Sequence, residues 1–281
     1  MKTKIKTLPR TLIPLLAKSR IFLAPMQEIN DIAFRLLCKK AGALTWTGLI
    51  SPLSPQLLDL QDKPILQLFS KDTRGISEFM KKYDSKVSGW DFNLGCPAKI
   101  AKKHGHGAFM AHDLKNIEEI LELMRKHTKK PLMVKIRKSK YANKILKIAE
   151  KYCDAICIHP RTTDQGYSGE PDLMFADNLK ANSKIPVIYS GNVTKENTKK
   201  LLKDFDFVMM GREAVGRPNV FWDKDTITFE DYLKLARKYK LSFTQMKFQA
   251  MNFTKEKRDS KKLRLKIFET KKLDDLKKVK I

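Results

Sequence analysis

The sequence is poor in acidic residues and in cysteine, and each shortage disfavours a class of protein. Its 281 residues include 31 Asp and Glu against 57 Lys and Arg, a formal net charge of +26. Such an excess repels itself in a compact chain, which favours a polyanionic partner, nucleic acid ahead of an anionic membrane surface. Four cysteines are too few for a disulfide framework in a chain of this length. They favour a reducing, cytoplasmic setting.

Long hydrophobic runs are also missing. No uncharged apolar stretch approaches the roughly 18 residues of a membrane span. The segment Thr11–Ala17 follows several lysines and imitates a signal peptide, but it is short and Pro14 interrupts it. We therefore expect neither a membrane span nor a secretion signal. Because 42% of the residues are hydrophobic, the chain can still fill a sizeable core, and global disorder is disfavoured.

Short apolar runs alternate with amphipathic ones along most of the chain. Helical spacing and capping residues predict helices over 31–41, 113–127 and 194–202. The alternation predicts an α/β protein with the fold of a (β/α)8 TIM barrel. An open doubly wound sheet is the alternative, because periodicity does not prove closure. The predicted buried strands span residues 21–25, 43–49, 64–69, 89–94, 131–136, 155–159, 186–189 and 205–210.

The last part of the chain has a different character. Residues 226–281 carry 17 Lys and Arg against 7 Asp and Glu, more than twice the net charge density of the preceding residues. Apolar residues at helical spacing predict helices near 232–239, 246–253 and 263–268. We therefore predict a barrel domain over 1–222 and a small basic helical domain over 226–281. A solvated lysine-rich face without a partner is the alternative for this tail.

Polar residues and glycines follow the predicted strands with regularity. In barrel enzymes the active site lies at the C-terminal ends of the strands, often with a phosphate bound after strands 7 and 8. Gly191 and Gly211 permit close backbone approach to an anion, and Arg212 can bind it with two N–H groups. The pattern predicts a phosphate-bearing cofactor or substrate. The candidate residues at these ends are Pro25, Met26, Gln67, Asn93, Cys96, Lys135, Arg137, His159, Arg161, Gly191, Asn192, Gly211 and Arg212.

The sequence around these positions resembles that of the tRNA-dihydrouridine synthases. The most specific segment is Asn93–Pro97, which reads Asn-Leu-Gly-Cys-Pro and is followed by the Gly-rich stretch Lys103–Met110. The order and spacing of the segments match that family over about residues 20–222, and the tail resembles its C-terminal helical domain more loosely. The other matching segments are Ala24–Met26, Leu66–Leu68, Val134–Arg137, His159–Thr162 and Gly211–Ala214.

The resemblance implies a reaction and a set of roles. FMN would lie across the top of the barrel, reduced by NADPH, and pass hydride to C6 of a tRNA uracil while a cysteine protonates C5. Cys96 would be that acid, with Asn93 and Lys135 as further catalytic residues. The tail would bind tRNA, and we expect a monomer without a metal. FMN would contact Pro25, Met26, Gln67, Lys135, His159, Gly191, Asn192, Gly211 and Arg212, and the substrate would contact Asn93, Lys99, Lys103, Arg137 and Arg161.

The chemistry requires these residue types. Hydride addition leaves negative charge at O4, which a nearby cation stabilises. A thiol with an ordinary pKa of about 8.5 is still protonated at neutral pH and can serve as the acid. Two alternatives stay open, namely a flavin-dependent dehydrogenase of a free pyrimidine or dihydroorotate, and a non-catalytic RNA-binding barrel. The net charge of +26 argues against a free base as substrate.

Two positions depart from the family pattern. The family often has Glu after the Thr of the second strand, where this chain has Thr47-Gly48. It often has Asn-Gly-Asp or Asn-Gly-Glu at the seventh strand, where this chain has Ser190–Asn192. We expect the first departure to weaken support for the site and the second to alter one phosphate contact.

Other polar pairs have simpler interpretations. His104 and His106 form a His-x-His pair, but no further zinc ligand is in register. We predict a mobile Gly-rich loop there that closes over the substrate, with Lys99, Lys102 and Lys103 facing RNA phosphates. Cys153 and Cys157 are predicted to be core residues rather than metal ligands.

Overall fold

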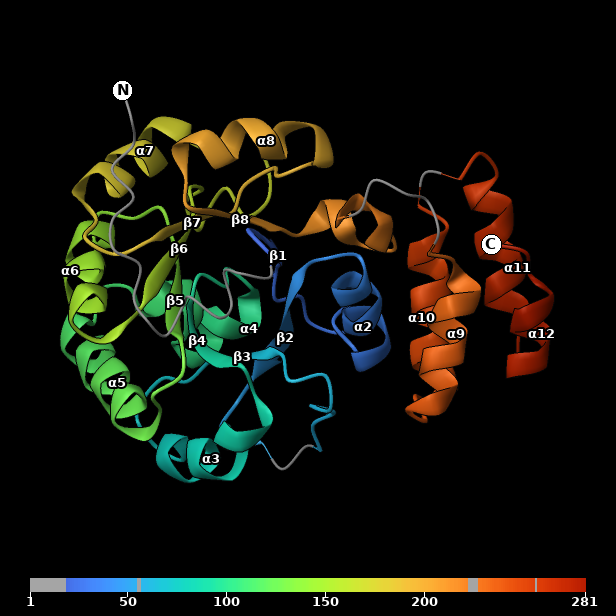
Figure 1. The fold of residues 1–281 in the computed structure, drawn as a ribbon, viewed down its shortest axis with the longest axis horizontal. Coiled ribbons are helices and arrows are strands. Elements are labelled where there is room, and N and C mark those ends of the chain that lie inside the picture. Colours follow the sequence, from blue (N-terminus) through green and yellow to red (C-terminus); the bar gives the residue numbers. More distant parts are fainter. Residues whose placement is uncertain (1–18, 55–56, 222–226, 256) are drawn as a thin grey trace.

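The computed structural model describes residues 19–54, 57–221, 227–255 and 257–281. Eight parallel strands pair in chain order, and β1 also pairs with β8, so the sheet closes into a barrel (Figure 1). Closure confirms the TIM barrel and excludes the open doubly wound sheet. The strands are β1 (Ile21–Leu23), β2 (Leu44–Ile50), β3 (Ile65–Leu68), β4 (Gly89–Leu94), β5 (Leu132–Arg137), β6 (Ala155–His159), β7 (Val187–Tyr189) and β8 (Phe207–Met210).

Helices surround the barrel, and the three that were predicted from capping residues begin with the expected side-chain caps. The Asp31 and Asp113 side chains each cap the helix that follows them. Thr194 forms a full capping box with Asn197, although the sequence rule expects Glu or Gln at that position. The helices are α2 (Ile32–Lys40), α3 (Ile76–Tyr83), α4 (Lys99–His104), α5 (Leu114–His127), α6 (Ala142–Tyr152), α7 (Leu173–Asn182) and α8 (Lys195–Asp204), with the 3-10 turns η1 (Asp84–Lys86), η2 (Gly107–Met110), η3 (Arg212–Ala214) and η4 (Pro218–Phe221).

The barrel interior is apolar where the strands begin and polar where they end. On β5, Met133 is part of the interior apolar cluster, and Lys135 points to the same side two residues later. On β3, Ile65 is followed in the same way by Gln67. The polar groups therefore collect at the C-terminal edge of the barrel. Three cysteines are buried in the core, namely Cys38, Cys153 and Cys157. This location was predicted for Cys153 and Cys157.

The tail forms four helices beside α2 (Figure 1). The hydrophobic core is continuous from α2 into this region, because Phe253 packs edge-on against Phe34 with ring centroids 6.4 Å apart. The predicted domain boundary falls at residues that the structure does not describe, as does the segment Thr11–Ala17. The tail helices are α9 (Phe229–Lys238), α10 (Phe243–Phe253), α11 (Ser260–Glu269) and α12 (Leu273–Lys278), the last of which the sequence did not predict.

One carboxylate joins the tail to the barrel. Asp31 Oδ2 accepts hydrogen bonds from Tyr232 Oη at 3.2 Å and from the Nε2 atoms of Gln245 and Gln249, both at 2.8 Å. Its other oxygen accepts from the Phe34 N–H and caps α2. Burial raises the pKa of Asp31, and these hydrogen bonds partly offset the rise. Helices α9 and α10 are therefore fixed to the start of α2.

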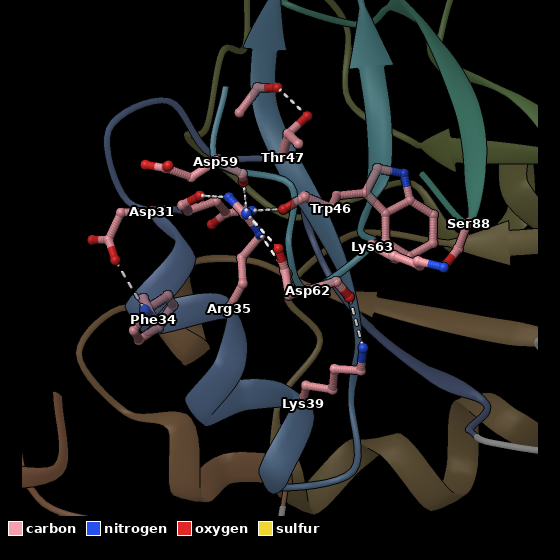
Figure 2. Close-up of polar contacts among 12 residues, drawn as sticks. Asp31, Phe34, Arg35, Lys39, Trp46, Thr47, Asp59, Asp62, Lys63 and Ser88 are labelled. Carbon is pink, nitrogen blue, oxygen red and sulfur yellow. Dashed lines mark hydrogen bonds and ion pairs between the residues drawn. The ribbon is translucent and has the colours of Figure 1, made fainter. Parts of the chain in front are cut away.

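A second cluster fixes the turn between β1 and α2 (Figure 2). The buried Arg35 guanidinium donates to both oxygens of Asp62, at 2.6 and 2.9 Å, and to the Asp59 carbonyl. It also donates to the Asn30 carbonyl at 2.7 Å, while Asn30 Nδ2 donates to the Ala24 carbonyl at 2.8 Å. The backbone that follows β1 is thereby held at the barrel edge.

Among the helices that the structure describes, none is long and apolar enough to cross a bilayer.

Candidate active site

A cavity of about 780 Å³ opens at the C-terminal ends of the strands. Its volume lies within the range of roughly 300–1,000 Å³ that is usual for small-molecule sites. Of the predicted site residues, Gln67, Lys99 and Lys103 do not line it. Those that do are Pro25, Met26, Asn93, Cys96, Lys135, Arg137, His159, Arg161, Gly191, Asn192, Gly211 and Arg212.

Cys96 is half-buried on the turn that follows β4. Asn93 Oδ1 accepts hydrogen bonds from the backbone N–H groups of Gly95 and Cys96, at 3.2 and 3.0 Å. The Cys96 carbonyl accepts from Ala108 N–H at 3.0 Å. A Cβ on Gly107, whose φ is +63°, would lie 2.8 Å from the same carbonyl, so glycine is required there. The backbone of Cys96 is held on both sides, and its side chain lines the cavity.

Gln67 lies behind Asn93 rather than at the cavity wall. It is fully buried, its Oε1 accepts from Asn93 Nδ2 at 2.8 Å, and its Nε2 donates to Asp91 at 2.7 Å. Asp91 also accepts from Trp46 Nε1 at 3.0 Å. Burial raises the pKa of Asp91 to about 6, against the opposing effects of the Gln67 hydrogen bond and the positive charge of Lys135. The sequence analysis missed Asp91, although it lies two residues before Asn93 and so faces the same interior.

Arg137 brings an unpartnered donor to the cavity. Its Nε donates to the Gly95 carbonyl at 2.8 Å and its Nη1 to the Thr162 carbonyl at 2.9 Å. Its Nη2 is buried and has no hydrogen-bond partner among the residues that the structure describes. Burial lowers the pKa of this guanidinium. Because an unpaired buried N–H is costly, Nη2 is available to a ligand acceptor such as a carbonyl oxygen.

His159 is neutral in this site. Burial is the main cause that lowers the pKa of His159 to about 2, and the positive charges of Lys135, Arg137, Arg161 and Arg212 add to it. Arg161 Nη1 lies 3.1 Å from His159 Nε2. Since a guanidinium can only donate, Nε2 is the acceptor and Nδ1 carries the proton. His159 therefore adds no charge to a cavity already rich in cations.

The cavity residues after β7 and β8 form a cationic end. Arg161 and Arg212 both donate to Asn192 Oδ1, at 2.9 and 2.7 Å. Asn192 is held at φ +44° and donates in turn to Glu170. Lys255 from the tail also lines the cavity, and its Nζ donates to the Arg212 carbonyl at 2.7 Å. Three cations meet where the sequence predicts a phosphate. Arg212 was predicted there, Arg161 was predicted at the substrate instead, and Lys255 was missed because it comes from the tail.

Tyr167 was also missed by the sequence analysis. Its ring lines the cavity and is 59% exposed. The guanidinium carbons of Arg137 and Arg212 lie 5.3 and 5.8 Å from the ring centroid, within the range of cation–π contacts. An aromatic residue between Gly166 and Gly169 in the segment after β6 was the available signal. Tyr167 presents an aromatic face at the cavity, beside two cations.

The first departure from the family pattern, Gly48, has a local explanation, and so does Gly191, which the chain shares with that pattern. A Cβ on Gly48 would lie 3.0 Å from Gln27 Oε1, which accepts from Leu49 N–H at 3.1 Å. Gly48 therefore leaves room for Gln27, which itself lines the cavity. A Cβ on Gly191 would lie 3.0 Å from Pro171 and 3.1 Å from the Tyr189 hydroxyl. Gly191 is thus required by packing within the chain, whatever the cavity binds.

The predicted Gly-rich loop is largely helical. Lys99, Lys102 and Lys103 lie exposed on α4, outside the cavity lining. His106 is buried against the Phe69 ring, with centroids 4.5 Å apart. The segment folds into α4 and η2, because the backbone hydrogen bond from Ala108 N–H to the Cys96 carbonyl and this buried ring hold it, and closure over a substrate stays a prediction. Within the described residues, no group of three or more His, Cys, Asp or Glu could hold a metal ion.

Comparisons with known proteins agree with this arrangement. Residues 22–278 match a family model described as dihydrouridine synthase. The chain is 34% identical over 223 residues to a probable tRNA-dihydrouridine synthase of Rickettsia bellii, covering 71% of this chain and 68% of the relative. It is 31% identical over 251 residues to tRNA-dihydrouridine synthase B of Pasteurella multocida, covering 77% and 74%. Morphinone reductase is similar in fold, with a TM-score of 0.50 at 10% identity over 72% of this chain and 85% of that one.

Proposed function

Because the chain belongs to the dihydrouridine synthase family, we propose that it reduces a tRNA uridine to 5,6-dihydrouridine, with FMN in the cavity and NADPH as the hydride source. One observation carries the proposal furthest. Cys96, the only half-exposed cysteine among the described residues, lines a cavity together with Lys135 and Arg137. A proton donor and cations at one cavity are what addition of hydride and proton across a uracil C5–C6 bond requires.

The residues of the cavity fit FMN. Arg161, Arg212 and Lys255 at the cationic end would bind its phosphate. Pro25 and Met26, on the turn after β1, would contact the isoalloxazine ring. When bound, the reduced flavin supplies the hydride that adds to C6 of the uracil.

The remaining polar groups would hold the uracil. Arg137 Nη2, buried and without a partner, would donate to a uracil carbonyl. Lys135 lies beside Asn93 in the β4–β5 register and would stabilise negative charge that develops at O4. Tyr167 offers an exposed ring face on which a base can stack. These contacts would place C5 of the uracil near the Cys96 thiol.

Cys96 would deliver the proton to C5. Its backbone is held by Asn93 and Ala108, so the thiol has a defined position at the cavity. His159 is a poor alternative acid, because burial keeps its imidazole neutral and Arg161 occupies its Nε2. Proton transfer would therefore use the thiol.

The tail would bind the tRNA backbone. Helix α11 buries only Ile267 and exposes Lys261, Lys262 and Lys266 to solvent. Three aromatic rings of the tail are not free to stack on bases, since Phe229, Tyr232 and Phe253 lie in the shared core. Recognition would rest on phosphate contacts and shape.

Mass spectrometry of tRNA tests this function. In tRNA from a strain that lacks the protein, we expect one uridine to lose its two-hydrogen mass gain, and purified protein with FMN and NADPH should restore it. Unchanged tRNA together with turnover of a free pyrimidine would favour the dehydrogenase alternative. A colourless protein that takes up no FMN would favour a non-catalytic RNA-binding barrel.

A further inference from the structure

A chain of hydrogen bonds runs from the barrel interior to the turn that carries Cys96. Trp46 Nε1 and Gln67 Nε2 both donate to Asp91 Oδ2, at 3.0 and 2.7 Å. Gln67 Oε1 accepts from Asn93 Nδ2 at 2.8 Å, and Asn93 Oδ1 accepts from the Cys96 N–H at 3.0 Å. Five residues on β2, β3, β4 and the turn after β4 are thus connected in series.

The donors and acceptors along this series of hydrogen bonds can be arranged in only one way. The amides of Gln67 and Asn93 can each be turned around, because oxygen and NH₂ ends have the same shape. The backbone N–H groups of Gly95 and Cys96 can only donate, so Asn93 must point its oxygen at them. Its NH₂ then requires the oxygen of Gln67, and the NH₂ of Gln67 requires an acceptor at Asp91. Any other arrangement leaves two donors facing each other in a buried site.

Asp91 provides that acceptor in either protonation state. Its Oδ2 takes both donors, and its Oδ1 is buried without a partner. Burial raises the pKa of Asp91 to about 6, and the groups that face it are Lys135 on β5, which lowers the pKa, and the buried thiols of Cys153 and Cys157. A proton taken up at lower pH has room on Oδ1 and leaves Oδ2 as acceptor.

We propose that Asp91 is a positioning residue, whose carboxylate accepts from Gln67, stabilises the Gln67 and Asn93 amides in the orientation that the backbone N–H groups require, and thereby holds the Cys96 turn at the cavity. Asp91 does not line the cavity, so it acts only through these residues. The chemical role of the Cys96 thiol in this inference rests on the proposed function. The way in which the thiol is held does not depend on that function.

Two substitutions separate the acceptor from the charge. Asp91→Leu removes the acceptor and keeps an apolar side chain of comparable size in the barrel. Asp91→Asn removes the charge but retains an oxygen where Oδ2 lies. The direct readout is the rate at which iodoacetamide alkylates Cys96 in the full-length protein, followed by mass spectrometry of its peptide, which needs no turnover. We expect Asp91→Leu to raise this alkylation rate about fivefold, because the loss of one net hydrogen bond increases the population of the displaced Cys96 turn by about that factor. Asp91→Asn should leave the rate near that of the original protein.

A matched control and a second variant keep the test decisive. Cys157→Ala disturbs the same interior but lies outside the series of hydrogen bonds, since its Sγ donates to Met209 Sδ, and it should leave Cys96 alkylation unchanged. Gln67→Met interrupts the series of hydrogen bonds one step closer to Cys96 and should raise the alkylation rate as Asp91→Leu does. It therefore provides the test if Asp91→Leu does not fold. An unchanged rate in folded Asp91→Leu, or in Gln67→Met, would overturn the positioning role.

Activity measurements distinguish this inference from the proposed function. In Asp91→Leu, uridine reduction should slow by about tenfold while NADPH oxidation by the bound flavin continues, and Asp91→Asn should restore most of the loss. If the original protein reduces no uridine, the proposed function fails, and Cys96 alkylation still decides whether Asp91 positions the turn. If it reduces uridine and alkylation is unaffected by Asp91→Leu, the function stands and the inference fails.

Discussion

The barrel edge and the tail are both rich in cations, but they hold them in opposite ways. At the cavity, Arg137 and Arg161 are at most 3% exposed, and protein oxygens hold their guanidinium groups. On α11, Lys261, Lys262 and Lys266 are all exposed. Fixed cations can recognise the shape of one ligand, whereas solvated cations respond mainly to the charge of a partner. The same residue types thus serve a specific site in one region and a general electrostatic surface in the other.

The two regions meet through few polar contacts. Asp31 accepts three side-chain donors from α9 and α10, and Lys255 reaches the cavity from the segment after α10. A Cβ on Gly216, in the segment after β8, would lie 2.0 Å from the Asn252 carbonyl, so the backbones of the two regions touch there. The tail is therefore part of the cavity wall as well as a neighbour of the barrel.

The largest effect is expected from Cys96→Ala. Removal of a general acid should slow uridine reduction by about 10²-fold or more, while FMN binding and NADPH oxidation continue. Single-turnover kinetics of the two half-reactions, with tRNA binding measured alongside, will separate these steps. Equal slowing of both half-reactions would show that Cys96 is structural.

Asp31→Ala should break the joint between the two regions. It removes the cap of α2 and takes one acceptor from Tyr232, from the half-buried Gln245 and from the buried Gln249. We expect a decrease of about 3 kcal/mol in the free energy of unfolding, read from urea denaturation. Asp113→Ala is the matched control, since it removes a helix cap alone and should cost about 1 kcal/mol. Equal decreases in the free energy of unfolding of the two variants would contradict the role of Asp31 in joining the tail to the barrel.

Arg212→Ala should weaken FMN retention by about tenfold, because the phosphate would have one charged hydrogen-bond donor fewer. Flavin content after dialysis and titration of the protein with FMN measure this. The control is Arg74→Ala, whose exposed guanidinium pairs only with the half-buried Asp72 among the described residues. Unchanged FMN affinity in Arg212→Ala would remove it from the phosphate site.

The smallest effect concerns the solvated cations. Replacing Lys261, Lys262 and Lys266 with Gln should weaken tRNA binding several-fold, and reduce the slope of log affinity against log salt by about 0.7–0.9 for each phosphate that the variant no longer neutralises. FMN affinity should not change. The same replacement of the exposed Lys81, Lys82 and Lys86 on and after α3 provides the control. If both triple variants lower tRNA affinity equally, the tail has no special role in docking.

Much of the barrel could be predicted from the sequence, because local rules decide it. Each predicted strand falls within about two residues of an observed one, since short apolar runs between capped helices have few other uses. Lys135 and Arg137 were expected on one face by the period of two, and both line the cavity. Gln67 was expected at the cofactor from the family resemblance. A strand position gives the face of a side chain but not its depth, and Gln67 lies one layer too deep to line the cavity.

The sequence alone thus determined which residues face the barrel interior, where the three helices with predicted caps begin, and that the net charge density is highest in the tail. Only the tertiary structure decided which side chains and backbone groups became hydrogen-bond partners. Gln67 meets Asp91, Asp31 meets Gln249, and Lys255 meets Arg212, across 24, 218 and 43 positions of sequence. Periodicity and capping act over a few residues, whereas these contacts depend on closure of the barrel and on the side of α2 against which the tail packs.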